Sequence, residues 1–327
     1  MQKEHYQWVD TCKTFGLLLV ILGHGRLLDD AYQQWIYSFH MPLFFILSGM
    51  LYNYKVPLQM LKHDIKRLLL PYLIINLICL VIQCGIRLWF GQLTLVSVIQ
   101  QIIGILVVSC HTGEYPSVST PTWFIIALFI ARMLLSLKNS RVYLYLIAIV
   151  SVLIYILLQY WRVDTWIPFD SAFMAIPFLV TGILSKRMLS LKCSLSYTIL
   201  PATIGFGCCF FLTKFNGLVD MAWASYGRNL LIFYFTGFIG SLSVILIIKS
   251  TPPIAVKICS VLSKGSLLVI GFNLILVMII QNFIERITPN HTIPMGVGII
   301  AGIAILGFFY ILTRWCQRYF PLILGTK

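Results

Sequence analysis

Two histidines at the ends of neighbouring apolar segments are the side chains best suited to chemistry. His24 stands between Gly23 and Gly25, which carry no side-chain bulk and let a backbone or a ligand come close. His40 lies about five residues into the next segment, which runs in the opposite direction, so both imidazoles are expected at similar depth. A lone histidine is more often a packed core residue, but a neutral imidazole is the natural general base near pH 7 and a second one can orient it. The pair therefore predicts a proton-transfer site with His24 as the base.

The same two histidines make a poor metal site. No carboxylate or pair of cysteines accompanies them at the spacing that zinc requires. The nine cysteines form no Cys-x-x-Cys motif, and most lie in or beside apolar runs, where they are expected as small buried hydrophobes. We therefore predict no metal ion and no permanently bound cofactor.

Charged residues in and beside these segments are candidates for binding an anionic substrate. Asp10 and Lys13 are three residues apart on one helical face, so they either form an interfacial ion pair or mark a functional site. Eleven residues of helix separate Lys13 from His24, a rise of roughly 16 Å. Lys66 and Arg67 stand where a third apolar segment begins, and a guanidinium at a helix start can bind a phosphate.

Composition shows which elements must position these side chains. Of the 327 residues, 59% are hydrophobic and only 10% are charged, and the mean hydropathy is +0.91. Soluble domains carry roughly 25% charged residues, so a soluble enzyme, a disordered tail and a fibrous repeat are excluded. The net charge of +14 falls in short loops, with no basic stripe that would bind nucleic acid. The partner expected instead is the lipid bilayer, and the fold class is an all-α, polytopic membrane protein.

The chain has ten apolar segments near the roughly 20 residues that a spanning helix needs. An eleventh run, 94–110, is short and contains Gln100 and Gln101, and we expect it at the outer surface or partly re-entering the membrane. No linker separates domains, so residues 1–327 are expected to form a single transmembrane domain. The predicted spans are 8–28, 35–53, 68–88, 121–137, 142–161, 167–185, 195–213, 228–248, 266–284 and 294–313.

The distribution of basic residues orients these spans. With ten spans and both termini in the cytoplasm, sixteen Lys and Arg residues fall on the inner side and six on the outer side. If 94–110 also crossed, every later loop would invert and this bias would largely collapse. The ten-span topology places the loops 54–66 and 138–141 inside and the stretch 89–120 outside.

Three stretches resemble the membrane-bound acyltransferase-3 family, in particular its fucose-4-O-acetylase-like and polysaccharide O-acyltransferase branch. The first is a basic residue followed after ten residues by histidine, Lys13 to His24, with Lys where many members have Arg. The second is FHMPLFFILSG, which holds His40 and ends in a small-residue pair, Ser48 and Gly49, suited to close helix packing. The third is IKRLLLPY, which contains Lys66 and Arg67; WFIIAL from Trp123 and IPFLVTGILSK from Ile176 are weaker matches.

The resemblance implies an integral enzyme of the bacterial cytoplasmic (inner) membrane. It would move an acyl group, most often acetyl from acetyl-CoA, to a hydroxyl of a cell-surface or lipid-linked glycan. Lys13, Lys66 and Arg67 would bind the acyl-CoA phosphates, and His24 and His40 would be catalytic. The supporting residues would be Asp10, Ser48, Trp123 and Asn273. Many members have a histidine late in the chain where this sequence has Asn273, which can only donate or accept a hydrogen bond.

An exporter or flippase of lipid-linked polysaccharide is the alternative function. Ten spans with polar residues inside them suit a transport pathway as well as an active site. The residues that favour this interpretation are Asn76, Gln281 and Asn282.

Overall fold

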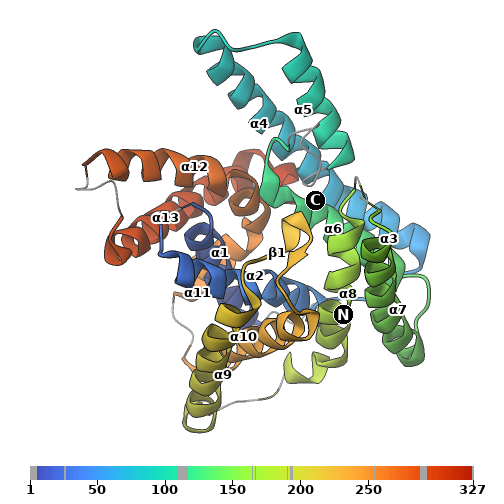
Figure 1. Ribbon diagram of the computed structural model, residues 1–327. Helices are drawn as coiled ribbons and strands as arrows, with labels where there is room; N and C mark the ends of the chain where they lie inside the picture. The colour runs from blue at the N-terminus through green and yellow to red at the C-terminus, as the bar shows by residue number, and fades with distance from the viewer. Residues whose placement is uncertain are drawn as a thin grey trace.

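Over the residues that the structure describes, the protein is a bundle of helices with one small hairpin of strands (Figure 1). The computed structural model describes residues 6–25, 27–108, 117–163, 165, 167–189, 191, 194–252, 255–287 and 293–325. Its helices are α1 (Gln7–Gly23), α2 (Asp30–Met50), α3 (Pro57–Asp64), α4 (Leu70–Trp89), α5 (Leu95–Val107), α6 (Trp123–Leu135), α7 (Arg141–Tyr160), α8 (Phe169–Leu184), α9 (Leu195–Asn216), α10 (Leu230–Ser250), α11 (Val256–Lys264), α12 (Ser266–Ile287) and α13 (Met295–Tyr319).

A helix occupies each of the ten ranges predicted as spans. By length and hydropathy, six helical segments of the described chain can cross a membrane: α3 continued into α4, α7, α9, α10, α12 and α13. Helices α6 and α8 are apolar but shorter. The all-α membrane class is confirmed, whereas the number of crossings and the side of each terminus remain predictions.

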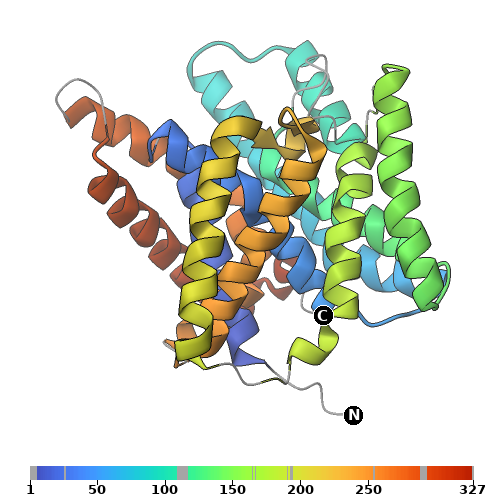
Figure 2. The same cartoon turned by 60° about the horizontal axis from the view of Figure 1, so that its bottom comes forward.

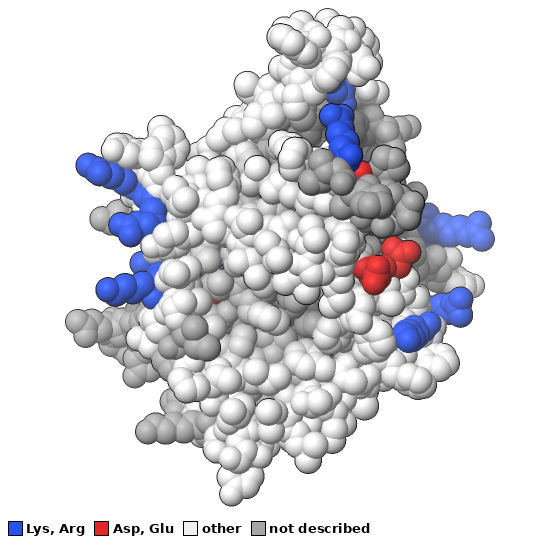
Figure 3. Space-filling model, turned by 90° about the vertical axis from the view of Figure 1, so that its left-hand side faces the viewer, with Lys and Arg blue, Asp and Glu red and all other residues white. Residues whose placement is uncertain are grey.

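The surface has the pattern that a bilayer requires. Figure 3 shows Lys and Arg side chains gathered near two opposite edges of one face, with a broad band of uncharged residues between them. Large apolar side chains are exposed on α4, α7 and α13, as Val81, Ile149 and Ile311 illustrate. Lipid tails cover such surface without the cost that water would impose.

Helices α1 and α2 form the centre of the bundle. Almost every residue of α2 from Ile36 onward is buried, and α2 packs against α1, α8 and α10. Gly49 is required for this packing, because a Cβ there would collide with the carbonyl of Leu179 on α8. Gly182 of α8 meets the carbonyl of Ile46 in the same way. The small-residue contact predicted at Ser48 and Gly49 is therefore a close crossing of α2 and α8.

The stretch 54–66, expected as a loop, is mostly helical. Pro57 lies in the first turn of α3, where its fixed φ favours a helix and its missing N–H costs nothing. A π-helical turn, Ile65–Leu69, joins α3 to α4, so that one helix of 33 residues runs from Pro57 to Trp89. The buried carboxylate of Asp64 fixes this helix by accepting hydrogen bonds from the Arg132 guanidinium at 2.7 and 3.1 Å.

Helix α5 covers most of the ambiguous run 94–110, and it turns back along α4 instead of continuing outward. Gln101 donates to Gln83 of α4 at 2.6 Å, and Tyr72, further down α4, donates to the carbonyl of Ile105 at 2.7 Å. The two helices thus form an antiparallel hairpin that projects from the bundle at the top of Figure 1. Gln101 is buried against α4, which explains why a polar residue interrupts an apolar run.

A short β-hairpin connects α9 to α10. Strands β1 (Val219–Asp220) and β2 (Ser225–Tyr226) are antiparallel, and a 3-10 turn, Met221–Trp223, lies between them. Figure 2 shows this hairpin at the upper end of the bundle, and β1 contacts α2, the helix that holds His40. It was not predicted from the sequence, because two-residue strands have no hydrophobic periodicity.

Candidate active site

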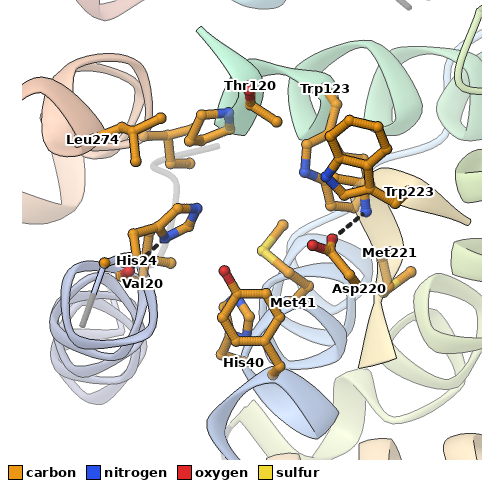
Figure 4. A pocket seen from close by; sticks show the side chains of 15 residues that line it. Val20, His24, His40, Met41, Thr120, Trp123, Asp220, Met221, Trp223 and Leu274 are labelled. Atoms are coloured by element: carbon orange, nitrogen blue, oxygen red, sulfur yellow. Dashed lines mark hydrogen bonds between the residues drawn. The ribbon is translucent and has the colours of Figure 1, made fainter. Parts of the chain in front are cut away.

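Both predicted histidines line one cavity of about 230 Å³ at the hairpin end of the bundle. Its walls come from α1, α2, the start of α6, α12 and the β-hairpin (Figure 4). This volume is below the roughly 300–1,000 Å³ of sites for drug-sized ligands. The lining residues are Val20, His24, Gly25, Tyr37, His40, Met41, Thr120, Pro121, Trp123, Asp220, Met221, Ala222, Trp223, Ile270 and Leu274.

His24 lies immediately after the last residue of α1 and remains bonded to that helix. Its Nδ1 is 2.6 Å from the carbonyl oxygen of Val20, and its backbone N–H bonds to the same oxygen at 3.1 Å. Because a carbonyl can only accept, Nδ1 must carry the proton, and in a neutral ring Nε2 is then the basic nitrogen. Figure 4 shows the ring directed into the cavity. The geometry therefore leaves Nε2 as the nitrogen that can accept a proton in the cavity.

His40 is held in the same way on α2. Its Nδ1 donates to the carbonyl of Ile36 at 2.9 Å, and only 2% of the residue is exposed. The ring of Tyr37 packs against both histidines, with its centroid 5.0 Å from that of His40 and 6.1 Å from that of His24. The structure thus brings together the two imidazoles that the sequence placed at similar depth.

The two glycines beside His24 make room for neighbouring side chains of the protein. A Cβ on Gly23 would lie 3.1 Å from a ring carbon of Tyr37, so this glycine makes room for that ring. Gly25 has φ of +81°, and a Cβ there would meet Val277 and Gln281 of α12. Both glycines therefore make room for the protein's own side chains, Gly25 in a left-handed turn, and Gly25 also lines the cavity.

Asp220 supplies the cavity with a carboxylate that the sequence did not single out. Its Oδ1 accepts a hydrogen bond from the backbone N–H of Ala222 at 2.9 Å. Burial raises the pKa of Asp220 to about 6, and this backbone bonding limits the rise. Its signal in the sequence was an acid and a tryptophan in a short turn between two apolar segments.

Trp123 is the one supporting residue from the sequence that lines the cavity, at the first turn of α6. Asn273 of α12 is fully buried, one turn after the lining residue Ile270. Its amide donates to the carbonyls of Val269 and Ile270 at 2.8 and 2.9 Å. Ser48 lies two turns beyond His40 on α2 and does not line the cavity. Ser48 and Asn273, which were predicted as supporting residues, therefore do not contact the cavity directly.

The predicted donor-binding residues lie toward the opposite end of the bundle from the cavity. Asp10 and Lys13 are in the first two turns of α1. Lys249 of α10 reaches the same end of α1, where its Nζ is 5.1 Å from the ring centroid of Trp8. Lys66 and Arg67 are exposed, and Arg67 lies inside the π-helical turn rather than at a helix start. Sequence reasoning missed Lys249 as a cation near Lys13.

Polar residues that suggested a transport pathway are engaged elsewhere. Asn76 is buried, and its amide donates to the carbonyl of Tyr72 at 2.9 Å and to the hydroxyl of Thr122 at 3.2 Å. Gln281 donates to Glu285 at 2.8 Å.

Within the described residues, no three His, Cys, Asp or Glu side chains gather as a metal site would require.

A comparison with protein families decides the assignment. A sequence profile of an acyltransferase domain matches residues 6–314, nearly the whole chain. The chain belongs to the membrane-bound acyltransferase-3 family. No curated protein and no solved structure gives a significant match. As a member of this family the protein is a membrane acyltransferase, and the cavity that holds His24 and His40 is its candidate active site.

Proposed function

We propose that the protein moves an acetyl group from cytoplasmic acetyl-CoA to a hydroxyl of a cell-surface or lipid-linked glycan, with His24 as the general base. The observation that carries this proposal is the hydrogen bond from Nδ1 of His24 to Val20, which leaves Nε2 basic beside a small cavity. A sugar hydroxyl is too weak an acid to attack a thioester unaided at neutral pH, so a positioned base is required.

The reaction needs one proton to move twice. As the hydroxyl oxygen of the acceptor bonds to the thioester carbonyl carbon, its proton passes to Nε2 of His24. Collapse of the tetrahedral intermediate breaks the carbon–sulfur bond, and the imidazolium returns the proton to the departing CoA thiolate. The ring of Tyr37 contacts both imidazoles and keeps the base in place, and Nε2 of His40 is a second polar atom that can bind the acceptor.

Donor and acceptor are expected to approach from opposite ends of α1. The rise from Lys13 to His24 is roughly 16 Å, comparable to the length of the pantetheine arm of CoA. Phosphates bound near Lys13, Lys66 and Arg67 would then allow the thioester to reach His24. In this arrangement the acyl group crosses the membrane within the protein while both ends of the chain stay in the cytoplasm of a bacterial cell.

An exporter or flippase explains the site less well. A transport pathway uses polar side chains that line it, but Asn76 and Gln281 are hydrogen-bonded to other residues and do not line the cavity. Two imidazoles with fixed tautomers are what acyl transfer needs and what passive passage of a glycan does not.

The test is transfer by the full chain reconstituted in lipid nanodiscs. Wild-type protein and His24→Ala are incubated with radiolabelled acetyl-CoA and with cell-surface glycan from a strain that lacks the protein. His24→Ala should lose about 10²–10⁴ in turnover while binding acetyl-CoA normally. Added imidazole should restore part of the turnover, because it replaces the missing base in the space that the side chain leaves.

A purely structural histidine would give a different result. Its replacement would lower the unfolding temperature, and imidazole would restore nothing. Near-normal turnover by folded His24→Ala, or a wild-type protein that releases no CoA, would refute the proposal.

A further inference from the structure

The β-hairpin forms the cavity wall opposite His24. Figure 4 shows His24 entering from α1 on one side and the carboxylate of Asp220 directed inward from β1 on the other. Met221, Ala222 and Trp223 complete this wall. The proposed base and a half-buried carboxylate therefore face the same small volume from two different elements.

The hairpin is held firmly in its position. Ser171 of α8 donates to the carbonyl of Met221 at 2.6 Å, and Asn216 donates to the carbonyl of Tyr226 at 3.0 Å. Ala224 has φ of +47°, a left-handed conformation that costs a residue other than glycine about 1 kcal/mol or more. Tyr155 donates to the carbonyl of Ala224 at 3.3 Å and supports this turn. This turn and these hydrogen bonds fix the directions of the preceding side chains, those of Asp220 and Trp223.

The side chains on this wall combine a hydrogen-bond acceptor with aromatic surface. The Asp220 carboxylate can accept hydrogen bonds from hydroxyl groups. Trp223 lines the cavity although 54% of it is exposed, and Trp123 lines it while 95% buried. A carboxylate for hydroxyls, together with indole rings for an apolar C–H face, suits a sugar ring, which presents both kinds of surface.

The negative charge of Asp220 lies away from the proposed binding site of the CoA phosphates. The phosphates of CoA are proposed to bind near Lys13, Lys66 and Arg67, toward the opposite end of the bundle, so this carboxylate faces the acceptor. Hydrogen bonds from sugar hydroxyls to a charged acceptor are the stronger kind.

We propose that Asp220 and Trp223 form the acceptor subsite: Asp220 accepts hydrogen bonds from hydroxyls of the sugar that is acylated, and Trp223 covers the face of its ring. This inference rests on the proposed acyl transfer and names the residues that select its acceptor. The alternative is that Asp220 only caps the hairpin turn and Trp223 only anchors the protein at the membrane surface.

The experiment varies the glycan and the donor separately. Asp220→Asn keeps the side-chain oxygen that accepts from Ala222 and removes the charge, so the hairpin stays closed. Trp223→Ala removes the ring and Trp223→Phe keeps an aromatic face. Asp29→Asn at the N-terminus of α2 and Trp161→Ala at the end of α7 are matched controls, because both residues are exposed and neither lines the cavity.

In nanodiscs with the purified glycan, Asp220→Asn and Trp223→Ala should each raise the glycan KM about ten-fold or more. The acetyl-CoA KM and the slow release of CoA to water should not change. Trp223→Phe should recover part of the loss, and both controls should match the wild type. Equilibrium binding of the glycan without acetyl-CoA should weaken by the same factor as its KM rises.

An unchanged glycan KM in both variants, or a raised KM for acetyl-CoA instead, would overturn the acceptor subsite. If Asp220→Asn does not fold, Asp220→Glu serves in its place, because it keeps the charge and displaces it by one methylene. A wild-type protein that transfers no acetyl group would defeat the proposed function. The binding measurement without donor would still decide whether Asp220 and Trp223 hold the sugar.

Discussion

The ring of Tyr37 meets the imidazole of His40 edge to face, with 5.0 Å between the centroids and 62° between the planes. The same ring is 6.1 Å from the imidazole of His24. Contacts of this kind contribute about 0.5–1.5 kcal/mol each beyond simple burial. Tyr37 is therefore a positioning residue for both histidines, one that no spacing in the sequence identified.

Tyr37→Ala should lower turnover about ten-fold or more, because the two imidazoles lose their shared neighbour. Tyr37→Phe, which keeps the ring, should retain most of the activity. We would measure kcat and the KM for acetyl-CoA separately, and only kcat should change. Tyr32→Ala is the matched control, since Tyr32 is on the same helix but packs against Phe210 of α9. Equal losses in Tyr37→Ala and Tyr32→Ala would count against a positioning role.

At the donor end, Lys13→Ala and Arg67→Ala should each raise the KM for acetyl-CoA. Each charge-assisted contact to a phosphate contributes about 1.5–3 kcal/mol, so the expected rise is at least about ten-fold. Lys249→Ala should also raise the KM for acetyl-CoA if the phosphates reach the end of α1 that holds Lys13. Lys138→Ala, an exposed lysine in another loop, should leave the KM unchanged. Unaltered donor kinetics in both Lys13→Ala and Arg67→Ala would remove them from the binding site.

The topology prediction concerns two connections. A reporter fused at residue 140 should be cytoplasmic, and a reporter in the β-hairpin at residue 225 should lie outside, because sixteen basic residues then face the cytoplasm and six do not. Paired alkaline phosphatase and fluorescent protein fusions measure both positions. Residue 140 on the outside would exclude the ten-span arrangement.

The crossing of α2 and α8 gives a prediction about stability. Gly49→Ala should lower the free energy of unfolding by about 1–3 kcal/mol, because the new Cβ meets the main chain of α8, which cannot move aside easily. Gly207→Ala on α9 meets no atom within 4 Å and should be neutral or stabilising by up to about 1 kcal/mol. Thermal unfolding in detergent compares the two, and equal melting temperatures would contradict the close crossing.

Acceptor binding should depend on pH through Asp220, whose pKa is raised to about 6 by burial. The carboxylate is charged above this value and protonated below it, so the glycan KM should rise about ten-fold from pH 7 to pH 5. The titratable groups that face it across the cavity are His24, His40 and Tyr37, while the lining residues from α6 and α12 are uncharged. Asp220→Asn should abolish the rise in KM, and a rise that persists in this variant would assign it to the histidines.

Much of this architecture follows from hydropathy, because a membrane helix must satisfy its backbone internally and present apolar side chains to lipid. That constraint located helices at all ten predicted ranges and paired His24 with His40. It could not locate Asp220 or Trp223, because a two-residue strand leaves no periodic signal and its contacts come from α2 and α8. It also failed at 54–66, where the Asp64–Arg132 pair, 68 residues apart, holds a helix that local sequence describes as a loop.

Both histidines take their orientation from main-chain carbonyls, those of Val20 and Ile36. A side-chain partner can be lost through one substitution, as when an aspartate that holds a catalytic histidine becomes asparagine. A carbonyl is present whatever residue occupies the position, so side-chain changes at Val20 or Ile36 leave the tautomer intact. The tautomer of each imidazole is thus insensitive to side-chain replacement at its hydrogen-bond partner, and a change must shift the helical backbone itself to remove that bond.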